Sequence, residues 1–87
     1  MRQHSRTFLL SPVTNQGNAD AQEGLGFLYY MGDGAPKDYV QAALWFRKAA
    51  EQGDAYAQKM LGDLYSDGQG VPQDHAQAAA WYRQAAT

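Results

Sequence analysis

The chain has 87 residues, which is enough for one small domain with a modest hydrophobic core. Charged residues make up 18% of it and the net charge is −2, so the sequence has no basic stripe that could neutralise phosphates. The composition therefore argues against nucleic acids and anionic membranes as partners.

The absence of cysteine excludes a disulfide framework and any thiolate metal site. No stretch of the sequence is long and apolar enough for a membrane-spanning helix, and Phe8–Leu10 is too short for the hydrophobic region of a signal peptide. These features predict a cytoplasmic protein that does not contact a membrane.

The sequence contains an internal repeat. The two copies are residues 17–52 and 53–87. A shift of 36 residues aligns residues 17–51 with residues 53–87, and more than half of the aligned positions are identical. Trp45, for example, returns as Trp81. A repeat of this length is typical of solenoid proteins, in which each copy forms one supersecondary unit. The sequence therefore predicts two copies of the same structural unit.

Residues 1–16 precede the first copy and depart from its pattern. The Gln16-Gly17 pair returns at the end of the first copy, which suits the eroded end of an earlier repeat. Pro12 would break a helix in that register, and it suits the first residue of a short helical turn better. We expect this segment to be partly disordered or to be a remnant of an earlier repeat.

The first copy predicts two helices, named here helix A over residues 18–31 and helix B over residues 38–51. Gly32 suits the left-handed conformation that commonly ends a helix. Asp38 is an N-cap residue, and Gln41 three residues later completes a capping-box pattern. Helix B is expected to bury its small and aromatic side chains, namely Ala42, Ala43, Phe46, Ala49 and Ala50.

The second copy repeats both predicted helices over residues 54–67 and 74–86. Gly26 lowers helix propensity by about 1 kcal/mol relative to alanine, so its return in the second copy indicates close packing between helices A and B. Gly24 has no such explanation, because its counterpart is Met60. The pattern predicts an all-α fold, a short right-handed α-solenoid of two antiparallel helical hairpins.

Catalytic and ligand-binding motifs are missing from the sequence. His4 and His75 have no partners at catalytic or metal-ligand spacing, so both are expected to be surface residues. The glycine-rich turns lack the preceding strand of a phosphate loop and the closing glutamate of a calcium loop. The aromatic residues around Trp45 could stack on bases, but their helical spacing favours a place in the core. We therefore expect no enzyme activity, no cofactor and no metal site.

The positions of helix A that differ between the two copies are three or one residues apart, which places them on one helical face. The A helices of helical-hairpin solenoids line the concave surface, where ligands bind. Several of these positions carry aromatic residues, which often dominate binding energy. Ordinary drift of a solvent-exposed face is the alternative interpretation. The predicted partner-binding residues are Asp20, Glu23, Phe27, Tyr30, Tyr56, Lys59, Met60 and Asp63.

The positions shared by both copies closely resemble the Sel1-like repeat, a relative of the tetratricopeptide repeat with a longer loop between its helices. The resemblance covers residues 17–87. The matching residues are the Leu-Gly and Leu-Tyr pairs of helix A, the glycines, proline and aspartate of the turn, and the Gln-Ala-Ala, Trp, Arg and Ala-Ala residues of helix B. This resemblance implies an adaptor or scaffold role with a protein or peptide partner of unknown identity.

Two functions remain open at this stage. The first is a protein–protein interaction module that binds a protein or peptide on the helix A face. The second is a structural protein that forms homo-oligomers through its exposed repeat ends. The second is considered because solenoids normally need about three or more repeats, or polar terminal repeats, to cover their ends.

Overall fold

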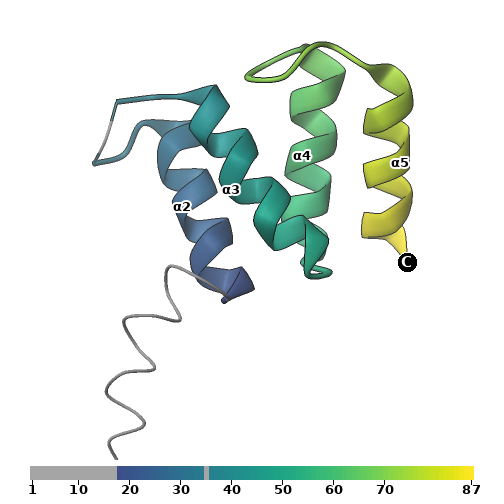
Figure 1. Ribbon diagram of the computed structural model, residues 1–87, viewed down its shortest axis with the longest axis horizontal. Helices are drawn as coiled ribbons and strands as arrows, with labels where there is room; N and C mark the ends of the chain where they lie inside the picture. Colours follow the sequence, from purple (N-terminus) through teal and green to yellow (C-terminus); the bar gives the residue numbers. More distant parts are fainter. Residues whose placement is uncertain (1–17, 35) are drawn as a thin grey trace, which may run out of the picture.

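The computed structural model describes residues 18–34 and 36–87, which form four α-helices and no strand (Figure 1). Each helix begins one residue later than predicted, because the N-cap residue itself lies outside the helix. The predicted N-terminal segment of residues 1–16 lies outside the described part of the chain. The helices are α2 (Ala19–Met31), α3 (Tyr39–Glu51), α4 (Ala55–Asp67) and α5 (His75–Ala86).

Side-chain oxygens cap the N-terminus of every helix. At the start of α3 the Asp38 carboxylate accepts a hydrogen bond from the backbone N–H of Gln41 at 3.1 Å, as the sequence predicts. A capping box would also have the Gln41 side chain accept a hydrogen bond from the Asp38 N–H, and this part of the prediction is wrong. The Asp38 N–H donates to the carbonyl oxygen of Tyr29 at 2.9 Å, and the Asp74 N–H donates to that of Tyr65 in the same way. These bonds fasten the N-cap residue of each B helix to the last turn of its A helix.

Helices A and B of each repeat approach closely at a glycine. A Cβ atom on Gly26 would lie 2.7 Å from the ring of Phe46, and one on Gly62 would lie 2.8 Å from the ring of Tyr82. Both distances are shorter than real side chains tolerate, so only glycine allows the aromatic ring to rest on the facing helix. The packing role predicted for Gly26 is confirmed.

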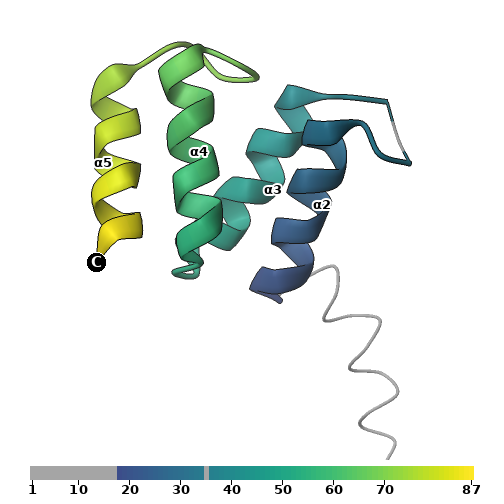
Figure 2. The ribbon, with the colours of Figure 1, turned by 180° about the vertical axis from the view of Figure 1, so that it is seen from behind.

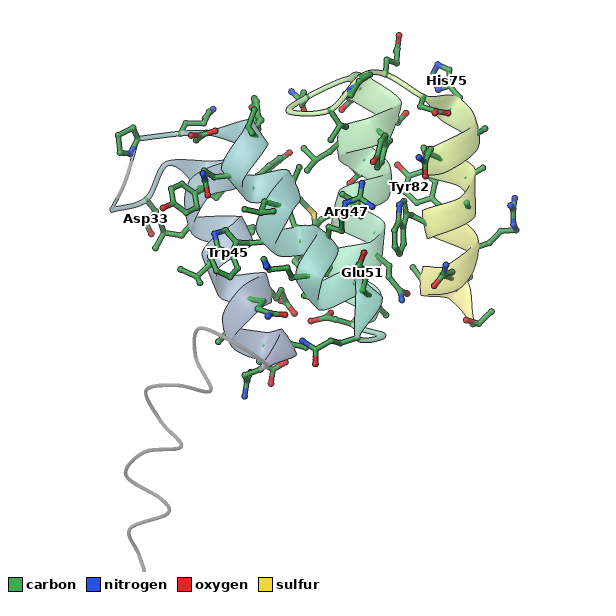
Figure 3. The ribbon with its side chains drawn as sticks, viewed as in Figure 1. Asp33, Trp45, Arg47, Glu51, His75 and Tyr82 are labelled. Atoms are coloured by element: carbon green, nitrogen blue, oxygen red, sulfur yellow. The ribbon has the colours of Figure 1, made fainter. Side chains whose placement is uncertain are left out.

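The two hairpins stack through α3 and α4, which are neighbours in the layer of helices (Figures 1 and 2). Arg47 extends from α3 toward α4, where its guanidinium donates to the hydroxyl of Tyr65 (Figure 3). The side-chain amide of Gln58 on α4 donates to the carbonyl oxygen of Ala50 on α3 at 3.1 Å. All five residues that the sequence placed in the core of helix B are buried: Ala42, Ala43, Phe46, Ala49 and Ala50.

The loop between α4 and α5 adds a second contact between the hairpins. Gly70 in this loop has a φ of 77°, and a Cβ atom there would overlap the carbonyl oxygen of Tyr39, the first residue of α3. Its counterpart in the first repeat is Gly34, which has a φ of 85° and no atom within 4 Å of a Cβ built on it. The two glycines therefore share a backbone conformation but differ in their surroundings.

This difference gives a test of the inter-repeat contact. Gly34→Ala should lower the free energy of unfolding by about 1–2 kcal/mol, the cost of a left-handed conformation for a residue with a Cβ. Gly70→Ala should cost about 1–3 kcal/mol more, because the new methyl group also displaces the loop from α3. Urea denaturation of both variants measures the difference. Equal losses would show that the loop does not hold the hairpins together.

Candidate functional site

The predicted binding face lies on α2 and α4, the A helices of the two repeats. Figure 2 shows α2 and α4 on the viewer's side of the layer, with α3 behind and between them. Phe27 is 41% exposed and Tyr56 is 42% exposed, which is unusual for large apolar side chains in so small a domain. These two residues are the most accessible aromatic side chains on this face.

Tyr30 connects the exposed aromatic residues to the core. Its ring stacks on Phe27 with the centroids 6.4 Å apart, and it packs against Tyr39 at 5.5 Å and Phe46 at 6.4 Å. Aromatic pairs with these geometries add stability beyond that expected from the surface area they bury. Tyr30 therefore holds Phe27 in place and presents only part of its own surface to solvent.

Met60 cannot contact a partner on this face, because it is only 5% exposed and belongs to the hydrophobic core. The sequence grouped it with surface residues because its counterpart, Gly24, differs from it. Gly24 is exposed, whereas α4 is covered by neighbouring helices on both sides. The difference at this position therefore reflects a change of environment between the two repeats, and Met60 leaves the candidate surface.

Lys59 and Asp63 form an ion pair at 3.1 Å on the exposed side of α4. Asp63 also accepts a hydrogen bond from the hydroxyl of Tyr82 on α5. The bond to Asp63 raises the pKa of Lys59, with smaller contributions from Tyr56 and Tyr30.

Three carboxylates meet near the N-terminal ends of the two A helices. Side-chain oxygens of Asp20, Glu23 and Asp54 all lie within 4.8 Å of one another. One oxygen of Asp54 caps α4 by accepting from the N–H groups of Tyr56 and Ala57. The other oxygen, Oδ2, is buried without a donor among the described residues. A hydrogen bond to Asp54, partial burial and the charges of Asp54 and Asp20 raise the pKa of Glu23 to about 7.

This carboxylate cluster can share a proton between Glu23 and Asp54. Oxygen ligands of this type also suit hard cations such as Ca²⁺, but Ca²⁺ takes about six to eight ligands and three carboxylates supply only a part of that number. The sequence placed Asp20 and Glu23 among the predicted partner-binding residues, but it did not indicate that Asp54 lies beside them. Glu23 and Asp54 are far apart in the sequence, so no local sequence pattern indicates that they lie close together.

The other sequence-derived candidates lie apart from this surface. His75 is exposed at the first turn of α5 (Figure 3). Trp45 and Trp81 are half-buried, and Trp81 packs against the core. Among residues 18–34 and 36–87, no helix combines the length and apolar character required to cross a membrane.

The repeated A–B hairpins and their stacking define the protein as a helical-repeat protein. The family model of the Sel1 repeat matches residues 19–54 and 55–87, so the chain belongs to the Sel1 repeat family. Sel1 repeats are generally protein–protein interaction modules. The comparison with curated proteins finds no match.

Two solved structures are similar to this chain. One is a Sel1 repeat protein from Oxalobacter formigenes, with 42% identity and a TM-score of 0.82 over 95% of this chain. The other is a protective antigen present in uropathogenic Escherichia coli strains that displays an SLR fold, with 40% identity and a TM-score of 0.83 over 92% of this chain. The chain spans 34% and 17% of the lengths of these two proteins.

The raised pKa of Glu23 predicts how stability depends on pH. The folded state binds this proton more tightly than the unfolded state, whose glutamate titrates near 4.5. The stabilisation is therefore fully present below pH 4.5 and is lost as the pH rises through about 7. Glu23→Gln should remove this fall in melting temperature, because an amide can donate to Asp54 without carrying a charge.

The matched control is Glu51→Gln, which removes the same charge from an exposed position on α3 (Figure 3). This variant should retain the fall in melting temperature between pH 4.5 and 7 that is expected for the wild-type chain. Thermal melts followed by circular dichroism across this range give the comparison. Parallel curves for the wild-type chain and Glu23→Gln would contradict proton sharing with Asp54.

Proposed function

We propose that the chain is a protein- or peptide-binding module whose partner contacts the A helices. The proposed recognition surface combines exposed aromatic side chains with an ion pair and an acidic edge. The observation that carries this proposal is the exposure of Phe27 and Tyr56 on the face where the two repeats differ. The recognition surface comprises Asp20, Glu23, Phe27, Tyr30, Tyr56, Lys59 and Asp63.

The chemistry of this surface favours a particular kind of partner. Phe27 and Tyr56 can each cover an apolar side chain, and aromatic residues of this kind dominate many interfaces. Asp20 and Glu23 add negative charge at one edge, where it would attract a lysine or arginine. A segment in which an apolar residue is followed by a basic residue is therefore the proposed ligand.

Binding, and not catalysis, accounts best for this arrangement. Two charged groups of the surface have structural partners, since Asp63 pairs with Lys59 and accepts from Tyr82. An enzyme would need a nucleophile with a neighbouring base, or a set of metal ligands with a substrate pocket. Three further statements remain predictions from the sequence: the chain needs no cofactor, it binds no nucleic acid, and it resides in the cytoplasm.

Replacing the two exposed aromatic residues tests this function. Peptides are first selected from a random library on the immobilised wild-type chain, and their affinity is then measured for the Phe27→Ser, Tyr56→Ser double variant. Binding should fall by about tenfold or more, because the loss of aromatic anchors commonly costs about 2 kcal/mol. The melting temperature should change little, since substitutions at exposed positions are usually worth about 0.5 kcal/mol or less.

The control changes exposed apolar residues on another helix. Val40 and Leu44 are 64% and 45% exposed on α3, so the Val40→Ser, Leu44→Ser double variant removes similar surface away from the A helices. This variant should bind the selected peptides as well as the wild-type chain does. Equal binding by the Phe27→Ser, Tyr56→Ser variant would place recognition elsewhere, and unfolding of that variant would assign both aromatic residues to the core.

A further inference from the structure

The two B helices carry the same residues on one face but differ in how that face is covered. Ala43 and Ala50 are buried on α3, which packs against α4. Their counterparts Ala79 and Ala86 are exposed on α5, which forms one edge of the stack (Figure 1). The tail face is defined here as Ala79, Arg83 and Ala86 on α5, all of them exposed.

The two A helices differ in the corresponding way. Five positions of α4 are buried, whereas their counterparts on α2 are half-buried or exposed. Because α4 packs against the preceding helix as well as against its own B helix, the difference marks the side that the preceding repeat covers. The head face is defined here as the α2 counterparts of these residues, namely Ala21, Gly24, Leu25, Leu28 and Tyr29.

Some residue types that make polar contacts across the α3–α4 interface also occur on the head face and the tail face. Arg47 donates to the Tyr65 hydroxyl and lies over the Tyr65 ring, 5.7 Å from its centroid. The same residue types recur as Arg83 on the tail face and Tyr29 on the head face. Gln58 on α4 also donates to the Ala50 carbonyl, but its counterpart Gln22 on α2 is buried and its side-chain oxygen accepts from Gln52, so this bond is not repeated at the head face.

We propose that the tail face of one chain packs against the head face of a second copy and repeats the α3–α4 contact. A second copy is the expected occupant, because most of the residues on both sides of this internal interface recur on α5 and α2. Such a head-to-tail contact is heterologous and does not close on itself, so further copies can add. The contact does not involve the recognition surface proposed above.

One position distinguishes the contact between chains from the contact within the chain. Gly24 stands on the head face where the internal interface has the buried Met60. A Cβ atom on Gly24 would have no atom within 4 Å, so a larger residue fits the single chain without strain. The missing side chain makes the contact between copies weaker than the contact within the chain.

The first experiment measures the mass of the full chain by sedimentation equilibrium over a wide range of concentrations. The average mass of the wild-type chain should rise with concentration. Ala79→Glu on the tail face should weaken this association by about tenfold or more, because the contact would bury a charge without a partner. The control Ala76→Glu makes the same change where the counterpart, Val40, remains 64% exposed, and it should associate like the wild-type chain.

The second experiment establishes the direction of the contact. Gly24→Glu blocks the head face, as Ala79→Glu blocks the tail face, so each variant alone should remain monomeric. An equimolar mixture should form a one-to-one dimer and nothing larger, since only one intact head and one intact tail can meet. If Gly24→Glu alone still dimerises, the copies pair tail to tail and the proposal is wrong.

A gain of association completes the test. Gly24→Met introduces the residue that the internal interface has at this position, and it should strengthen association at least several-fold. Circular dichroism confirms that each variant keeps the helical content of the wild-type chain. A wild-type chain and a Gly24→Met variant that both stay monomeric at all concentrations would overturn the proposal.

Discussion

In each repeat an aromatic ring of helix B rests on a glycine of helix A. Gly26 receives the ring of Phe46, and Gly62 receives that of Tyr82. The contact fixes how closely the two helices approach and which of their faces meet. The alanines of helix B can then be buried in the narrow space that remains. Without this approach the hairpin would have no core, because a chain of this size buries few large apolar side chains.

The same contact determines which residues are left for other purposes. With one side of α2 committed to α3, the residues on its other sides are available for a neighbouring repeat or for a ligand. Phe27 lies on the side of the proposed recognition surface and is held by Tyr30, whose ring packs against Phe46 in the core. Leu25 and Tyr29 lie on the side where a preceding repeat would pack. The proposed recognition surface and the head face therefore use different sides of α2.

Differences between the copies have more than one cause. In the second repeat Phe27 is replaced by Asp63 and Phe46 by Tyr82, and the new hydroxyl donates to the new carboxylate. This polar pair joins α5 to α4 within the chain, so the change at these positions does not need a partner to explain it. At Met60 the difference follows from burial. Phe27 and Tyr56 have no such explanation in packing, because both remain about two-fifths exposed, and this is why they stand at the centre of the proposed recognition surface.

The sequence by itself determined the elements of this fold. Caps such as Asp38, the left-handed Gly32, and the period of the apolar residues act over a few neighbouring positions, so each can be read without knowing the rest of the molecule. The internal repeat then predicted two equivalent hairpins. The role of Gly26 could also be predicted, because a residue that weakens a helix at the same place twice has to serve packing.

Only the tertiary structure decided which residues meet across the repeats. It buried Met60, directed the Asp38 N–H to a carbonyl of the preceding helix, and brought Glu23 to the cap residue Asp54. Helical periodicity tells which residues share a face, but not whether a neighbouring helix covers that face. Whether a face is covered depends on how the hairpins stack. That stacking is determined by contacts between residues far apart in the sequence.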